Sequence, residues 1–134
     1  MAIVWTADLA VGVPEIDAQH QELFRRIDQL LEASHQGKGK EVVLTTVKFL
    51  EQYVVTHFQN EDQAMSGSHY PDRLKHLEEH RCFIQNFQEL KQRIEKDGVN
   101  VHTIILTNRV VVKWLTHHIL TVDKALGQYL REEP

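Results

Sequence analysis

Residues 71–94 have the sequence PDRLKHLEEHRCFIQNFQELKQRI, and their pattern indicates the fold class of the chain. The apolar and histidine side chains of this stretch recur at three- and four-residue spacing, at His76, His80, Phe83, Phe87, Leu90 and Ile94. That spacing sets them on one face of an α-helix. Pro71 suits the first helical position because proline lacks the N–H that a helix start leaves unpaired, and the pattern stops near Asp97-Gly98. The stretch therefore predicts an amphipathic helix that turns two histidines inward.

Two earlier stretches show the same periodicity and predict helices over 17–35 and 40–65. Glycine-containing segments follow both of them, at 36–39 and 66–68, and Gly67 is predicted to be a left-handed cap. The inward-facing residues are Ile16, His20, Leu23, Phe24, Ile27, Leu30 and Leu31 in the first helix, and Val43, Val47, Leu50, Val54, His57, Glu61 and Met65 in the second.

Residues 102–120 have a strand-like composition, with the runs Ile104-Ile105-Leu106 and Val110-Val111-Val112. The length of the segment and its periodicity nevertheless favour a fourth helix, and a short helix over 123–131 is expected to follow. Its predicted stripe is Ile104, Asn108, Val111, Leu115 and His118. Four helices with short connections predict an all-α, up-down-up-down four-helix bundle with a short N-terminal arm and a short C-terminal helix.

Seven residues with metal-binding side chains are spread over these helices: His20, His57, Glu61, His76, His80, His118 and Asp123. Spacings of four put His57 with Glu61, and His76 with His80, on one helix face. In the predicted topology all four helices bring their histidines to the same end of the bundle. Asp123 follows His118 by five residues, about 140° around a regular helix, which predicts that the fourth helix bends or ends there.

The composition of this set indicates two metals of the iron, manganese or zinc type, because it holds imidazoles and carboxylates but no thiolate. Two six-coordinate metals offer twelve positions. Five histidines, two bridging carboxylates and a shared oxo or hydroxo group would occupy eleven of them. The remaining position predicts the binding of one small ligand.

A lone histidine on an apolar face is more often a hydrogen-bonded core residue than a ligand. Four inward-facing stripes that carry histidine at one level would, however, leave buried polar groups unsatisfied without a cation. His118 is preferred over its neighbour His117 because it is in phase with Val111 and Leu115. The histidines at 35, 69, 102 and 117 are expected to be solvated, and Cys82 to be a half-buried small apolar residue.

Length and charge narrow the class of protein further. The 134 residues predict one domain over 1–134, and 15 basic against 19 acidic residues give a formal net charge of −4. Scattered basic residues argue against a nucleic-acid partner. The sequence contains no apolar run long enough to predict a membrane span, and its first residues show no secretory signal pattern. With Cys82 as the single cysteine, the sequence predicts a cytoplasmic protein.

The seven residues, in this order and spacing, resemble the hemerythrin family and its bacterial single-domain members, the bacteriohemerythrins. The similarity runs from Trp5 to about Leu130 and includes Ile16-Asp17-Ala18-Gln19-His20, Tyr70-Pro71 and Trp114-Leu115-Thr116-His117-His118. His117, beside the matching His118, is the main local departure from the pattern.

The resemblance implies a four-helix bundle around an oxo- or hydroxo-bridged, non-haem di-iron centre. His76, His80 and His118 would hold one iron, His20 and His57 the other, and Glu61 and Asp123 would bridge them. O2 would bind at the open position on the two-histidine iron, with Leu115 and Ile119 as the apolar wall of its pocket.

Reversible O2 binding for storage, delivery or buffering is therefore the leading hypothesis, in a protein that is not an enzyme. An oxygen-requiring enzyme could be the partner that receives the O2. Two alternatives stay open at this stage: an oxygen or iron sensor that acts through a separate partner, and a di-iron enzyme that consumes peroxide or nitric oxide. No residue outside the seven resembles a dedicated acid, base or nucleophile, which disfavours the enzyme.

Overall fold

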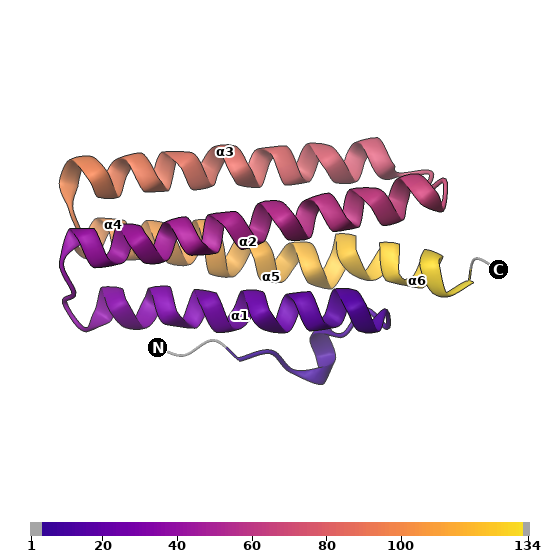
Figure 1. The fold of residues 1–134 in the computed structure, drawn as a ribbon, viewed down its shortest axis with the longest axis horizontal. Coiled ribbons are helices and arrows are strands. Elements are labelled where there is room, and N and C mark those ends of the chain that lie inside the picture. The colour runs from indigo at the N-terminus through magenta and orange to yellow at the C-terminus, as the bar shows by residue number, and fades with distance from the viewer. Residues whose placement is uncertain (1–3, 133–134) are drawn as a thin grey trace.

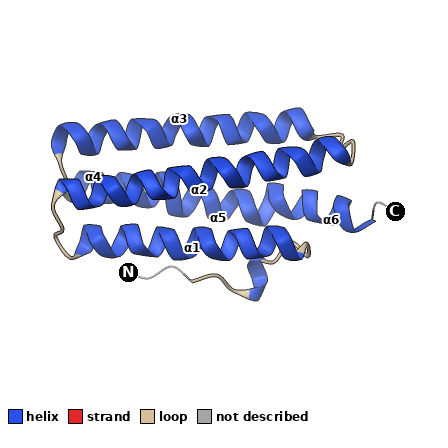
Figure 2. Cartoon of the chain, in the orientation of Figure 1, coloured by secondary structure: helices blue, strands red, loops and turns tan. Residues whose placement is uncertain are grey.

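The computed structural model describes residues 4–132 as an antiparallel four-helix bundle, and it confirms the predicted fold class (Figure 1). The first three helices are α1 (Pro14–His35), α2 (Lys40–Gly67) and α3 (Arg73–Asp97). Short loops join neighbouring helices, and no strand occurs within the described residues (Figure 2). The predicted domain over 1–134 includes residues 1–3 and 133–134, which lie outside the described part.

The fourth helix is a continuous helical run over 101–132 in which two wider π-helical turns interrupt the α-helix. Its segments are α4 (Val101–Thr107), η2 (Asn108–Lys113), α5 (Trp114–His118), η3 (Ile119–Asp123) and α6 (Lys124–Glu132). A reciprocal pair of hydrogen bonds between Asn100 and Thr103 caps its start. The fourth helix does not end at Asp123, which was one of the two predicted outcomes there, because the backbone stays helical on both sides of that residue.

The π turns explain why the predicted stripe of this helix is wrong at two of its positions. The buried residues recur every four positions, at Thr103, Thr107, Val111, Leu115, Ile119 and Asp123. In a regular α-helix each step of four over-rotates by about 40°, so five steps would turn the stripe by about 200°. Each π turn takes up one extra residue, about 100°, and two of them cancel the drift. Ile104 and Asn108 were predicted to face inward, but they are only half-buried.

Side chains supply hydrogen bonds where the helix widens. The Thr107 hydroxyl donates to the carbonyl of Thr103 over 2.7 Å, and the Thr121 hydroxyl donates to the carbonyl of His117 over 2.8 Å. Such bonds compete with the regular helical pattern and bend or distort helices.

Two smaller expectations at the α2–α3 connection are corrected. Gly67 is the last residue of α2, and the left-handed residue is His69, with φ of 56°. Pro71 lies in the turn before α3, which begins at Arg73. Elsewhere in the bundle two predictions are confirmed. The histidines at 35, 69, 102 and 117, which were expected to be solvated, are exposed, and Cys82 is half-buried.

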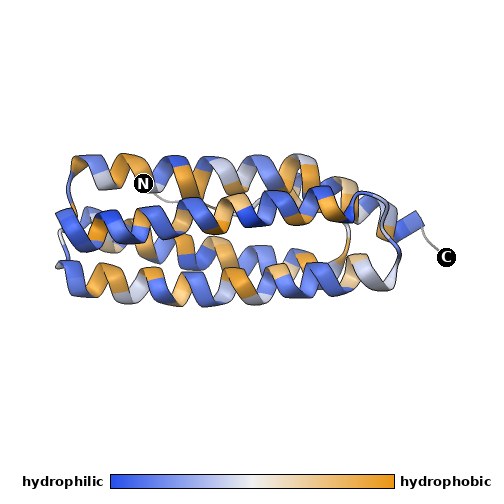
Figure 3. Ribbon diagram, turned by 90° about the horizontal axis from the view of Figure 1, so that it is seen from above, coloured by the Kyte–Doolittle hydropathy of each residue, from blue (hydrophilic) through white to orange (hydrophobic). Residues whose placement is uncertain are grey.

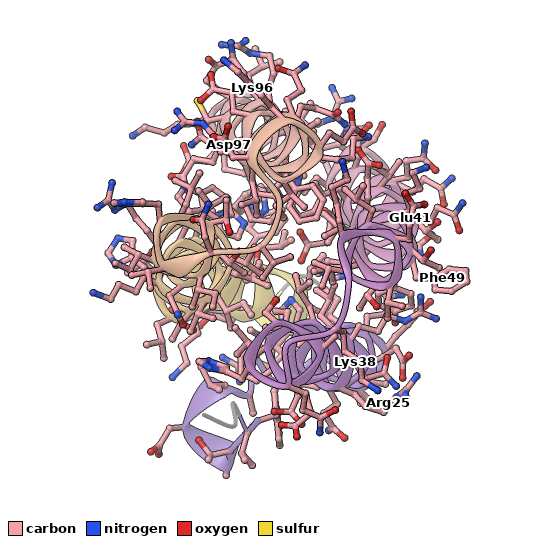
Figure 4. All side chains as sticks on the ribbon, turned by 90° about the vertical axis from the view of Figure 1, so that its left-hand side faces the viewer. Arg25, Lys38, Glu41, Phe49, Lys96 and Asp97 are labelled. Atoms are coloured by element: carbon pink, nitrogen blue, oxygen red, sulfur yellow. The ribbon has the colours of Figure 1, made fainter. Side chains whose placement is uncertain are left out.

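The amphipathic helices build a core that runs the length of the bundle. Each helix alternates hydrophobic and hydrophilic residues (Figure 3), and charged side chains radiate outward when the bundle is seen end-on (Figure 4). The N-terminal arm crosses α6, where a Cβ on Gly127 would meet the carbonyl oxygen of Val11 at 2.3 Å. Asp17 holds the same arm by accepting the backbone N–H groups of Val11 and Gly12. The absent side chain of Gly127 thus permits the arm to close over the end of the bundle where the seven predicted ligands lie.

Candidate metal centre

The structure brings all seven predicted metal-binding side chains to one end of the bundle, where α1 and α3 begin (the right-hand end of Figure 1). None of them is more than 5% exposed. The spacing of four on α2 and on α3 acts as expected, since each pair projects from one face about one helical turn apart. His118 points into the bundle and is 1% exposed, whereas His117 lies on the surface.

Asp123 reaches the cluster because of the second π turn. In η3 a wider turn separates His118 from Asp123. A spacing of five therefore places these two side chains on the same face of the helix, as a spacing of four does for His57 and Glu61 in α2. The carboxylate of Asp123 is 1% exposed, and its Oδ1 lies 3.1 Å from Nε2 of His118. Helical widening, and not a helix end, brings this side chain inward.

The seven side chains form two groups that share both carboxylates. Within each group the potential ligand atoms lie no more than 4.8 Å apart. The larger group consists of Glu61, His76, His80, His118 and Asp123, and the smaller one consists of His20, His57, Glu61 and Asp123. The two groups therefore differ by one histidine.

Each carboxylate directs one oxygen to each group. Oε1 of Glu61 lies 3.3 Å from Nε2 of His76 and 3.1 Å from Nε2 of His80, and its Oε2 lies 3.3 Å from Nε2 of His57. Asp123 does the same, because its Oδ1 faces His76 while its Oδ2 lies 3.1 Å from Nε2 of His20. This is the arrangement of two carboxylates that span a pair of cations.

The distances between ligand atoms fit six-coordinate metals. Neighbouring ligands on an octahedral metal with bonds of about 2.1 Å lie about 3.0 Å apart. The separations quoted above are 3.1–3.3 Å, and Nε2 of His20 lies 3.1 Å from Nε2 of His57. Two imidazole nitrogens that face each other at this distance have room for a cation beside both.

Several buried polar atoms lack a hydrogen-bond partner within the described residues, which is the second sign that a cation belongs here. Nε2 of His80 and Nε2 of His118 lie 3.1 Å from carboxylate oxygens, but neither is oriented for a hydrogen bond. Oε2 of Glu61 and Oδ1 of Asp123 are also without a hydrogen bond. Buried polar atoms normally find partners, and a metal would satisfy all four.

The pKa values of the clustered side chains show which charges a cation would replace. Burial by itself lowers the pKa of His20, but the adjacent Asp123 and Glu61 outweigh burial and raise that pKa to about 9. The same carboxylates raise the pKa of His76 to about 9. Burial raises the pKa of the Glu61 carboxyl, yet the surrounding imidazoles hold it well below its usual range. Protons on His20 and His76 thus help to balance the carboxylates, and metal binding would displace them.

Four residues that sequence reasoning missed surround these side chains. Gln19 and Glu79 contact outer ring nitrogens of His57 and His118 at 2.5 and 3.0 Å. The ring of Phe58 is stacked on His80, with centroids 3.7 Å apart and planes at 3°. Trp114 is stacked on His118 in the same way, at 4.8 Å and 11°. Most of these contacts join different helices, so periodicity along one helix gives no signal for them.

The fold and the cluster together define a helical-bundle protein of the hemerythrin type. The hemerythrin HHE cation-binding domain matches residues 11–130, and the chain therefore belongs to the hemerythrin family. It is 30% identical over 129 residues to a bacteriohemerythrin of Methylococcus capsulatus, covering 96% of each chain. It is 24% identical to myohemerythrin-1 of Phascolopsis gouldii, covering 90% of this chain and 87% of the relative.

Solved structures agree with this assignment. A crystal structure of wild-type hemerythrin superposes with a TM-score of 0.85 and is 28% identical, covering 97% of this chain and 98% of the other. Membership of the family, whose members are oxygen carriers and not enzymes, implies non-haem iron as the metal of the cluster. Within residues 4–132, none of the helices has the length and apolar character that would let it cross a membrane.

Proposed function

We propose that this protein binds one O2 reversibly at a di-iron centre, for storage, delivery or buffering of oxygen. The observation that carries this proposal is the pair of unequal groups that share two carboxylates. One group offers five ligand atoms and the other four, so a further shared oxygen ligand would complete the first metal and leave one position open on the second. A single open position suits one small ligand.

The roles that follow for the seven residues are part of the proposal. His76, His80 and His118 hold one iron, His20 and His57 hold the other, and each of the two carboxylates bridges them. The support is the orientation of Glu61 and Asp123, each of which directs one oxygen to either group. Two bound ferrous ions would together supply the two electrons that O2 takes up.

Reversibility is supported by the make-up of the shell and by its burial. Five neutral imidazoles and two carboxylates leave a di-iron centre more positive than a carboxylate-rich shell would, which disfavours O–O cleavage. Leu115 and Ile119 are 1% and 0% exposed and lie in the core on the same helix as His118. In this proposal they form the apolar wall that keeps water and anions from the open position.

A cytoplasmic location is also part of the proposal, since a protein with one half-buried cysteine needs no oxidising compartment. A partner that takes up the released O2 is proposed to be an oxygen-requiring enzyme.

The test of this function is metal analysis combined with optical titration. Anaerobically reconstituted protein is expected to contain two irons per chain, and the reduced form to bind one O2 per pair, with release under vacuum. Charge-transfer bands of an oxo-bridged diferric centre should appear on oxidation. One zinc per chain, or no iron after reconstitution, would contradict the di-iron centre. Rapid turnover of peroxide or nitric oxide by the reduced protein would contradict the proposed carrier function and indicate an enzyme.

The proposed apolar wall makes a separate prediction. Leu115→Ala and Ile119→Ala are each expected to retain two irons but to shorten the lifetime of the oxygenated protein, because the cavity admits water and anions. Truncating a buried leucine or isoleucine costs about 2–5 kcal/mol of stability. Leu90→Ala is the matched control, since Leu90 is fully buried in α3 ten residues beyond His80 and should be destabilised similarly.

Autoxidation is followed optically with and without azide, and thermal unfolding is measured alongside. Leu115→Asn should shorten the lifetime more than Leu115→Ala does, because an amide can hold a water near the site. Equal autoxidation rates in the wild type, both alanine variants and the Leu90 control would show that these side chains serve core packing alone.

A further inference from the structure

Within residues 4–132, two of the five histidines in the cluster have a hydrogen-bond partner at the outer ring nitrogen, Nδ1, and the other three do not. Nδ1 of His57 lies 2.5 Å from Oε1 of Gln19, and Nδ1 of His118 lies 3.0 Å from Oε1 of Glu79. Nδ1 of His20, His76 and His80 has no partner within the described residues. One imidazole in each group therefore has a polar partner at Nδ1. In the smaller group this partner is a neutral amide, and in the larger group it is a carboxylate.

The two contacts follow one pattern in the two halves of the bundle. Gln19 directly precedes His20 on α1 and reaches across to His57 on α2. Glu79 directly precedes His80 on α3 and reaches across to His118 on α5. In each half the receiving histidine is followed by the shared carboxylate, at a spacing of four in α2 and of five through the π turn. The halves thus correspond in the placement of these residues, while the charge of the outer acceptor differs.

A hydrogen bond to Nδ1 decides which ring nitrogen is free. When Nδ1–H donates to Gln19 or Glu79, the lone pair of Nε2 stays available, and Nε2 is the atom that faces the shared carboxylates in both His57 and His118. Outer partners of this kind fix the tautomer and the ring orientation and raise the basicity of the imidazole. A carboxylate raises it more than an amide does, because its charge stabilises the Nδ1–H.

We propose that Gln19 and Glu79 are positioning residues that hold His57 and His118 for metal binding, and that the negative charge of Glu79 makes the three-histidine side the more electron-rich one. This rests on the proposed di-iron centre. The smaller group, with the neutral amide behind His57, is the one that the proposed function leaves with an open position. The two acceptors would therefore make the metal that stays closed the stronger electron donor of the pair.

The positioning role is tested first without iron or O2. Metal-free wild type and variants are titrated with Zn²⁺ against a chromophoric chelator. Glu79→Ala is expected to weaken zinc binding at one of the two sites by about 10–100-fold, the loss typical of removing such a partner. Glu79→Gln keeps an acceptor and should lose less. Glu78→Gln is the matched control, since it removes the same charge one residue away, where the side chain is 57% exposed and paired with Arg81.

Two further readouts separate positioning from general stability. In zinc-loaded protein the Nδ1–H resonance of His118 should be visible by NMR in the wild type, Glu79→Gln and Glu78→Gln, and be lost to exchange in Glu79→Ala. In iron-loaded protein Glu79→Gln should raise the reduction potential of the centre, and Gln19→Glu should lower it.

Unchanged zinc affinity and an unchanged His118 resonance in Glu79→Ala would overturn the positioning role. Equal potential shifts in Glu79→Gln and Glu78→Gln would overturn the contribution of the hydrogen-bonded charge. A wild type that loads two metals but does not bind O2 would refute the proposed function, while the zinc and NMR results would still decide the positioning role.

Discussion

His118→Ala is expected to abolish the paired iron centre, whereas His117→Ala is expected to leave iron content and the optical spectrum nearly unchanged. His118 is 1% exposed and has a shared carboxylate on one ring nitrogen, Glu79 on the other and Trp114 against its face. Its removal deletes a proposed ligand and leaves a cavity lined with unsatisfied groups, one of the mechanisms that give large losses of stability. The His117 ring lies on the surface.

Iron per chain and the charge-transfer spectrum measure this difference, and circular dichroism shows whether each variant stays folded. His118→Gln is a useful companion, because it retains a polar side chain and limits the cavity. Equal loss of iron in the two alanine variants, or a larger loss in His117→Ala, would mean that the wrong histidine has been assigned to the metal.

Asp123→Ala and Glu61→Ala are expected to disrupt metal pairing more than they disrupt the binding of a single metal. Each carboxylate directs one oxygen to either group, so one substitution removes a ligand atom from both. It also removes negative charge between two cations that lie about 3.5–4 Å apart in two-metal sites, where their repulsion is large. Iron content should fall below two per chain, and any pair that remains should oxidise faster.

Asp62→Ala is the matched control for these variants. Asp62 follows Glu61 directly but forms a surface ion pair with Arg73 at 2.8 Å, so its loss should cost little stability and no iron. Magnetic coupling between the irons, followed by Mössbauer spectroscopy, reports pairing independently of total iron. Two coupled irons with a wild-type oxygenation lifetime in both bridge variants would exclude the bridging role.

Most of the fold could be predicted because helical periodicity is a local property. The stripes in α1, α2 and α3 lie where their three- and four-residue spacing placed them, and the loop between α1 and α2 contains the expected glycines. Details of chain reversal were harder, since several residues can take a left-handed conformation. At the α2–α3 turn that residue is His69 instead of Gly67, and Pro71 precedes the helix that it was expected to start.

The fourth helix was predicted less well, because its pattern does not follow the period of an α-helix. A repeat of four residues from Thr103 to Asp123 is out of step with 3.6 residues per turn, and only packing against the other helices keeps it buried. The sequence showed that Asp123 did not fit a regular helix. It did not show that the helix would widen, since the cost of a π turn is offset by burial of the whole stripe.

The residues of the candidate site could be predicted from the sequence alone: five histidines and two carboxylates on four helices, all at one end of an antiparallel bundle. These follow from residue type, spacing and topology, which need no knowledge of contacts between helices. The packed helices were needed to show which oxygen of Glu61 and Asp123 faces which histidine, and that Gln19 and Glu79 reach across to His57 and His118. Those features depend on the rotation and separation of packed helices, which are set by interactions among all four and not by the pattern within any one.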